Sequence, residues 1–271
     1  MIVYAQTKFV FTLYRYTHHK RRKIMLLSIL FFILSIIPSI LIFILLRNRQ
    51  KDNILYRKKC NLSFISGLVS VLPILLVSGI LYLLSAIMKF TLLNGVNILV
   101  YRAIYTFIVL ALAEELMKYL ALRFVLKRNP YACSWADVVA FMVIVGTAFG
   151  LIEDVPYAVG ASPVIMLVRG FTMGHVGYGF IMGWFYGKRL YTGKKRYGAF
   201  AVLVPWLIHG LYDFSLSSEL LALNDNFAFL GVSLALLDIV LLILMIRFFI
   251  RSKKRERYQQ PLTAPGQPAE Q

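Results

Sequence analysis

Residues 97–126 read NILVYRAIYTFIVLALAEELMKYLALRFVL and decide the class of the fold. The stretch is long enough to cross a bilayer, which takes about 20 consecutive apolar residues in a helix, yet it carries Glu114, Glu115 and Lys118 near its middle. A charge in mid-membrane costs at least roughly 2.5–3.5 kcal/mol, so such residues mark functional sites unless a structural partner explains them. These three residues are therefore the first candidates for chemistry.

The rest of the chain has the composition of a polytopic membrane protein. Hydrophobic residues make up 59% of its 271 positions and charged residues only 15%, a balance that excludes an ordinary soluble domain. The apolar runs predict an all-α membrane helix bundle with about seven transmembrane helices. We expect them at residues 24–46, 64–88, 97–126, 135–158, 163–186, 197–216 and 227–250, which together form one membrane-embedded domain over 24–250.

The net charge of +18 indicates membrane topology and not nucleic-acid binding. A nucleic-acid binder concentrates basic residues on one polar face, whereas here they fall in short loops between the predicted spans. The loop 47–59, the pair after the third span, the loop 188–196 and the start of the tail are basic, and the alternate loops are short or acidic. By the positive-inside rule we expect the basic loops and the C-terminus in the cytoplasm.

The two ends of the chain fall outside this bundle. Seven spans with an inside C-terminus place the N-terminus outside, which conflicts with the basic run at 18–23. We hypothesise that the native chain begins at Met25, so that the basic segment 1–23 is not part of it; an intact mass that includes residues 1–24 would contradict this. Residues 251–271 are polar and rich in Pro and Gln, a composition typical of a disordered tail.

Ionisable residues recur in the next three spans. Glu153 and Asp154 form a second carboxylate pair in the fourth span, and we expect Arg169 in the fifth to neutralise one of them. His175 follows in the fifth span among glycines, which are typical of a face where helices approach closely. A structural alternative remains for each feature, because a buried charge can simply be paired and a lone histidine can be a hydrogen-bonded core residue.

In the sixth span, His209 and Asp213 are four residues apart and therefore share a helix face. An aspartate that accepts from one ring nitrogen fixes the tautomer of a histidine, as metal ligation or proton transfer requires. At a rise of about 1.5 Å per residue, the polar residues of the four spans fit within a slab of roughly 10–15 Å. They can therefore converge on one site.

The order of these motifs on four consecutive spans resembles the PrsW family of intramembrane proteases, and through it the CAAX-processing endopeptidases and bacteriocin-processing proteins. The likeness covers residues 110–214 and rests on Glu114-Glu115-x-x-Lys118, Phe149-x-x-x-Glu153, the glycine-flanked His175 and His209-x-x-x-Asp213. It implies a multi-pass protein of a bacterial cell membrane that makes the first cut in a membrane-anchored substrate, typically an anti-sigma factor in a stress response. It also implies that Glu114, Glu115, Glu153 and His175 are essential, with His209 supporting them. From the residues themselves we expect Lys118, Asp154, Arg169 and Asp213 to support this site.

The chain departs from the family pattern at Asp154 and Asp213, where the family often has Asn. The extra carboxylates favour metal binding or a shared proton. Since the spans offer no credible Ser or Cys nucleophile, two routes to an activated water stay open. Either a glutamate is the general base, or His175, His209 and Glu153 hold a Zn²⁺ ion, for which two histidines and a carboxylate are a conventional set.

Two other classes of protein also place Glu, Asp and His inside a membrane. An ion- or proton-coupled transporter does so, although transporters usually show paired repeats with broken helices. A non-catalytic binding protein on the same fold would keep the helix packing without needing both glutamates. A protease would need both, together with a membrane protein substrate.

Overall fold

The computed structural model describes residues 26–27, 29–76, 79–80, 97–128, 133–160 and 169–255. Within these ranges the regular structure is helical, which confirms the predicted all-α class. The elements are a helix at 29–47, η1 (Asn48–Gln50), α2 (Ile54–Val69), a helix at 71–76, α4 (Ile98–Ala103), η2 (Ile104–Ala111), α5 (Leu112–Arg128), α6 (Trp135–Gly160), a helical turn at 169–172, α8 (Gly174–Thr192), α9 (Arg196–Ser215), α10 (Ser218–Leu223) and α11 (Asn226–Arg255).

Several of these helices are suited to crossing a membrane. In the described part, four are both long and apolar enough: Ile29–Gln50, Ile54–Leu76, Trp135–Val155 and Asn226–Ser252. The third and sixth predicted spans are also helical, because α4, η2 and α5 follow one another from 98 to 128 and α9 covers the sixth. The predicted number of seven is therefore approximate.

The structure corrects three of the predicted boundaries. Helix α2 begins at Ile54, so much of the predicted loop 47–59 is helical, and Lys59 is buried. The predicted fifth span is interrupted at Met173, whose backbone is left-handed (φ 51°). This residue ends the helical turn at 169–172, and α8 begins directly after it. Helix α11 continues to Arg255, beyond the predicted start of the tail. Residues 1–25 and 256–271, which include the predicted N-terminal segment and most of the tail, lie outside the described residues.

Helix α6 is the centre of the bundle. Its residues 138–145 are completely buried, because the helix is apolar on all sides and packs against α2, α5 and α8. Glycines bring α8 very close: a Cβ on Gly179 would lie 2.9 Å from the carbonyl oxygen of Met142, and one on Gly183 would lie 2.8 Å from the Cα of Val139. Two glycines of the predicted packing face, Gly179 and Gly183, thus form the contact between α6 and α8, whereas Gly174 and Gly177 face α11.

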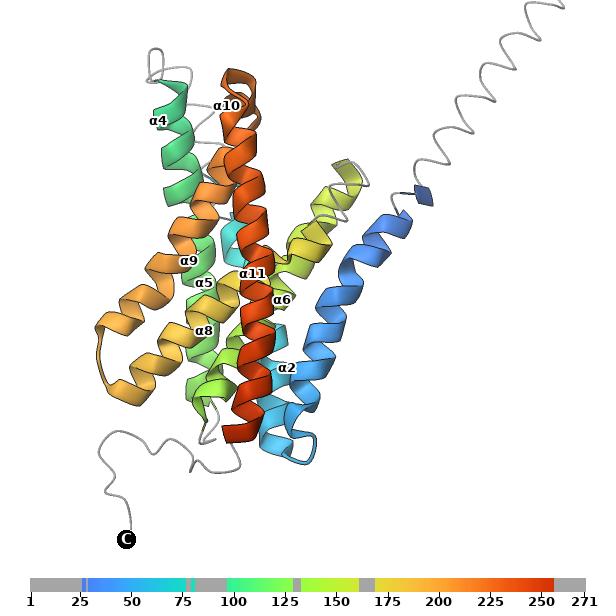
Figure 1. Ribbon diagram of the computed structural model, residues 1–271, viewed down its shortest axis with the longest axis vertical. Coiled ribbons are helices and arrows are strands. Elements are labelled where there is room, and N and C mark those ends of the chain that lie inside the picture. The colour runs from blue at the N-terminus through green and yellow to red at the C-terminus, as the bar shows by residue number, and fades with distance from the viewer. Residues whose placement is uncertain are drawn as a thin grey trace, which may run out of the picture.

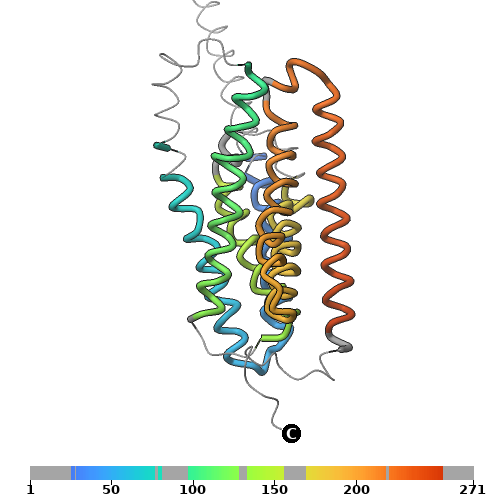
Figure 2. The backbone as a smooth tube through the Cα atoms, turned by 90° about the vertical axis from the view of Figure 1, so that its left-hand side faces the viewer, coloured from blue at the N-terminus to red at the C-terminus, as the bar shows by residue number. Residues whose placement is uncertain are grey.

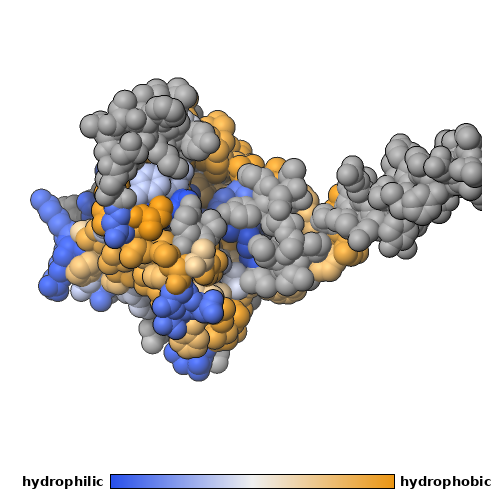
Figure 3. Space-filling model, turned by 90° about the horizontal axis from the view of Figure 1, so that it is seen from above, coloured by the Kyte–Doolittle hydropathy of each residue, from blue (hydrophilic) through white to orange (hydrophobic). Residues whose placement is uncertain are grey.

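Figures 1 and 2 show the helices running broadly along one axis, with α11 on the outside of the bundle and the helix at 29–47 diverging from it toward the upper end of Figure 1. The connections after the helix at 29–47 and between α8 and α9, together with the end of α11, lie at the lower end. Leucine and isoleucine side chains are exposed along the outer faces of the helices, as expected for contact with lipid. Seen from above, hydrophilic residues are visible among the hydrophobic ones (Figure 3).

Candidate active site

The early turns of α5 carry two glutamates and one lysine. The Lys118 Nζ lies 2.8 Å from Glu115 Oε1 and 3.5 Å from Glu114 Oε2, and it also lies 4.0 Å from the centre of the Phe149 ring. Glu115 and Lys118 are completely buried, whereas the side chain of Glu114 is 13% exposed. One ammonium group therefore faces two carboxylates, so ion pairing with Lys118 alone leaves negative charge uncompensated.

The π-helix η2 immediately before these residues anchors α5 to α9. The Trp206 indole N–H donates to the carbonyl oxygen of Phe107 at 2.6 Å. A Cβ on Gly210 would lie 2.6 Å from the Phe107 ring, so only glycine fits there without a shift. Wide π-turns are frequent at functional sites. Here the turn lies where the chain must bring the α5 glutamates and the α9 histidine together.

His209 is the residue of α9 that reaches the glutamates. Its Nδ1 lies 3.0 Å from Glu115 Oε1, while its Nε2 lies 3.2 Å from Asp213 Oδ2 and 3.8 Å from Glu114 Oε2. The ring is buried and stacks on Tyr178, with 5.0 Å between ring centres. Glu115 therefore holds one ring nitrogen, and the other points toward Glu114 and Asp213.

His175 lies at the start of α8, directly after the left-handed residue Met173. Its Nδ1 accepts a hydrogen bond from Lys118 Nζ at 2.8 Å, and its Nε2 donates to Glu153 Oε2. A Cβ on Gly150 would lie 3.3 Å from the His175 ring. The glycine on α6 thus makes room for His175, which connects Lys118 of α5 with Glu153 of α6.

The α6 carboxylates meet an arginine from the turn at 169–172. The Arg169 guanidinium donates to Glu153 Oε1 at 2.9 Å and to Asp154 Oδ1 at 3.0 Å. All three side chains are partly exposed, with Glu153 the most exposed at 25%. The sequence predicted that Arg169 neutralises one carboxylate, and in the structure it contacts both.

A pocket of about 570 Å³, including its open mouth, adjoins this cluster. The helix at 29–47, α6, the turn at 169–172, α8, α9 and α11 all contribute to it. Its polar lining residues include Glu153, Asp154, Arg169, His175, Tyr178, His209, Asp213 and Asp238. Glu153 is therefore the glutamate of the cluster that faces the pocket, while the α5 residues support the two histidines from behind.

Comparison with known proteins shows what kind of molecule has these motifs. The PrsW family intramembrane metalloprotease pattern matches residues 59–246. The chain belongs to this PrsW family. Protease PrsW of Clostridioides difficile (strain 630) is 28% identical over 201 residues, which cover 69% of this chain and 79% of that protein. Protease PrsW of Shouchella clausii (strain KSM-K16) is 30% identical over 159 residues, covering 57% and 68%, respectively. No solved structure matches the chain.

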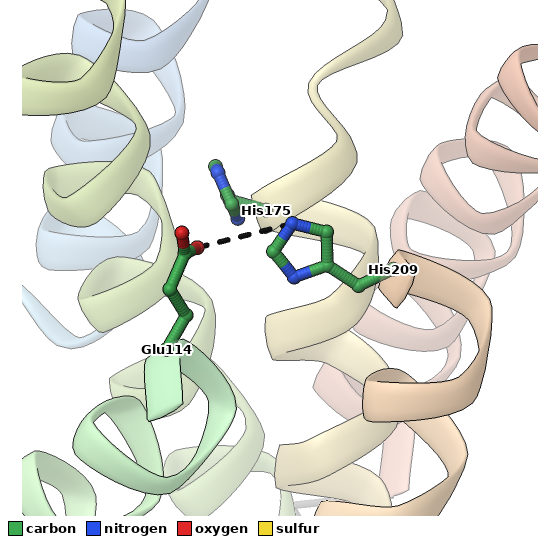
Figure 4. A group of neighbouring side chains, drawn as sticks. All are labelled: Glu114, His175 and His209. Carbon is green, nitrogen blue, oxygen red and sulfur yellow. Dashed lines mark ion pairs between the residues drawn. The ribbon is translucent and has the colours of Figure 1, made fainter. Parts of the chain in front are cut away.

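Membership of the PrsW family makes the chain a membrane-embedded peptide hydrolase, and it raises the question of a metal. Among the described residues, Glu114, His175 and His209 offer ligand atoms that all lie within 4.8 Å of one another, and their side chains point toward a common space (Figure 4). Two imidazoles and a carboxylate suit Zn²⁺, and a carboxylate behind one histidine is the usual second partner of such a ligand. Glu115 provides that partner for His209, so the residues fit a metal.

The composition of this group differs from the predicted metal set, which contained Glu153 in place of Glu114. Glu153 contacts His175 and Arg169 instead. Both ring nitrogens of His175 also have partners, Lys118 and Glu153. A metal bound by His175 would therefore replace one of these two contacts.

The structure brings all the predicted site residues into one connected cluster. It adds two residues that were not predicted, Tyr178 and Asp238, which line the pocket. Tyr178 is three residues after His175 and thus on the same face of α8. Asp238 is an isolated acidic residue in the middle of the last predicted span. Its position in an apolar segment is the only feature of the sequence that points to a role in the site.

Proposed function

We propose that this PrsW family member hydrolyses a peptide bond in a single-span membrane protein such as an anti-sigma factor, with water activated in the pocket between α6, α8 and α9. The observation that carries the proposal is the cluster of Glu114, Glu115, Glu153, His175 and His209 beside a pocket within the membrane bundle. Placing carboxylates and imidazoles inside a membrane costs free energy, and such residues are typical of functional sites.

Glu153 is the proposed general base. It lines the pocket and its side chain is a quarter exposed, so a water molecule beside it can transfer a proton to a carboxylate oxygen. The same carboxyl group can then give the proton to the leaving amine, the usual second step of general acid–base catalysis. Arg169 and His175 hold Glu153 from two sides and fix the direction of its oxygens.

Glu114, His175 and His209 are the proposed metal ligands. A bound Zn²⁺ ion supplies an activated water and polarises the scissile carbonyl group. The role of the protein is to orient the ligands: Glu115 accepts the Nδ1 proton of His209, and Nε2 faces Glu114 and Asp213. Lys118 keeps the two α5 carboxylates close together despite their repulsion.

The proposed orientation places the basic lower end of Figure 1 in the cytoplasm. The positive-inside rule supports this direction, because the connections that carry most basic residues lie together at that end. The C-terminus is then cytoplasmic. The pocket is lined by the first residues of α8, and the far end of this helix leads to the basic connection between α8 and α9. The proposed site therefore lies away from the cytoplasmic end of α8.

A survey of protein N-termini in cell membranes tests the function. Cells that express the wild type are compared with cells that express Glu115→Gln or the exposed control Asp225→Asn at equal levels. A new N-terminus in a single-span protein that is present with the wild type and the control and absent with Glu115→Gln supports the proposal and identifies the substrate. Identical profiles for all three chains under several envelope stresses would contradict it.

A further inference from the structure

Asp238 on α11 is a buried acid that the proposed reaction does not use. Its exposure is only 2%, and its Oδ1 atom has no hydrogen-bond partner among the described residues. Leaving a buried acceptor unpaired costs about 1–3 kcal/mol, and more when the group is charged. A cost of this kind is expected where a ligand supplies the missing partner.

The carboxylate lies beside the start of α8, next to the candidate catalytic residues. A Cβ on Gly174 would lie 3.1 Å from Asp238 Oδ2 and 3.3 Å from the Tyr178 hydroxyl. Asp238 also lines the same pocket as His175 and His209. The unpaired acceptor therefore belongs to the wall of the site and not to a separate part of the core.

The start of α8 offers hydrogen-bond donors on the same wall. The first N–H groups of a helix have no partner within the helix, and the side chain of Met173 does not cap this one. The amides of Val176 and Gly177 bond to the Met173 carbonyl oxygen at 2.8 and 3.2 Å, and the two residues before them, Gly174 and His175, line the pocket. The wall thus presents N–H donors and, next to them, a carboxylate acceptor.

An unwound peptide in a membrane needs partners of both kinds. A helix must open locally before its peptide bond can be attacked, and each freed backbone N–H and C=O group costs several kcal/mol in hydrocarbon. We propose that this wall binds the backbone of the unwound substrate, with Asp238 accepting a hydrogen bond from a substrate N–H group near the scissile bond. The α8 amides donate to a neighbouring substrate carbonyl group. This inference rests on the proposed proteolysis.

The test combines substitutions at Asp238 with single ester replacements in the substrate backbone. The probe is a synthetic peptide of the membrane segment identified by the survey of N-termini, in liposomes with the full-length enzyme. Each ester replaces one amide near the cut and so removes one N–H group. We expect one ester position to lower kcat/KM for the wild type by at least about tenfold, since hydrogen bonds to charged groups are among the strongest. The same ester should cause no further loss of kcat/KM in Asp238→Leu.

Asp238→Asn keeps a neutral acceptor, so its kcat/KM should lie between those of the wild type and Asp238→Leu. Thermal stability separates binding from a purely structural role, because removal of an unpaired buried charge should leave the melting temperature unchanged or raise it. Ester effects that are equal in wild type and both variants would overturn the inference. Failure of the wild type to cleave the unmodified peptide would instead count against the proposed proteolysis.

Discussion

Lys118 determines the charge balance of the site at the scale of single residues. Its ammonium group is completely buried between Glu114, Glu115 and His175 and contacts all three. Loss of one partner of a buried ion pair leaves an uncompensated charge, which usually costs more than the pair contributes. The lysine is therefore needed for stability even if it never touches the substrate.

Replacing Lys118 by methionine keeps the approximate length of the side chain and removes its charge. We expect Lys118→Met to lower the free energy of unfolding by about 3–5 kcal/mol, the usual cost of breaking a buried pair. Adding Glu115→Gln should restore part of this loss, because the orphaned carboxylate is then neutral. Reversible unfolding in detergent measures this free energy for the wild type, Lys118→Met and the double variant. A loss below about 1 kcal/mol for Lys118→Met would show that solvent already compensates these charges.

Glu115→Gln tests the positioning of His209. The amide retains a possible acceptor for Nδ1 but loses the charge that pairs with Lys118 and orients the ring. Loss of a carboxylate behind a metal-ligating histidine typically lowers metal affinity or activity about 10–100-fold, and we expect a loss in this range for zinc affinity. Titration with Zn²⁺ measures it, with Asp225→Asn as the exposed control; equal affinities would exclude Glu115 from this role.

The sequence singled out the residues of this cluster because charges inside apolar spans are conspicuous. It could not establish which carboxylate accompanies the histidines. The predicted metal set contained Glu153, whereas in the structure Glu114 lies with the two histidines, and the choice depends on how α5 and α6 are rotated about their axes. Asp238 was missed for the same reason, because only the packing of α11 on α8 brings it to the pocket.

At the scale of elements, the close contact between α6 and α8 controls the position of His175. A Cβ on Gly183 would lie 2.8 Å from the Cα of Val139 and 3.0 Å from the Cβ of Met142. Because one of these neighbours is backbone, whole helices must separate to make room. The sequence predicted this glycine face, whereas it predicted a continuous fifth span in place of the break at Met173, since methionine gives no signal for a left-handed backbone.

Gly183→Ala should therefore act through the helix contact. We expect a loss of about 1–3 kcal/mol in the free energy of unfolding, as overpacked cores show, together with lower peptidase activity as α8 carries His175 away from Lys118. Gly79→Ala is the matched control, because a Cβ there meets nothing within 4 Å. Unfolding and cleavage assays on both variants check the result, and equal behaviour of the two would contradict the close packing of α6 and α8.

At the scale of the whole molecule, the distribution of basic residues predicts how the bundle sits in the membrane. Lys194 is exposed in the connection between α8 and α9, and Asn224 is exposed in the connection before α11, at the opposite end. The native cysteines, Cys60 and Cys133, are buried. Single introduced cysteines at the two ends should therefore give a clear signal.

We expect a membrane-impermeant thiol reagent to label Asn224→Cys in intact cells and Lys194→Cys only after the cells are opened, because basic connections stay in the cytoplasm. The wild type, with its buried cysteines, is the background control. Labelling of Lys194→Cys in intact cells would reverse the proposed orientation.

The most direct test of the central claim is cleavage by the purified chain alone. Full-length enzyme and the substrate identified in the survey are reconstituted in liposomes with Zn²⁺, and the mass of the product gives the cut bond. We expect one new end in or beside the membrane segment of the substrate with the wild type, and a rate at least about 100-fold lower for Glu153→Gln, the usual scale for loss of a general base. Cleavage by Glu153→Gln at the wild-type rate would contradict the assignment of the general base, and absence of cleavage by the folded wild type would contradict the proposed function.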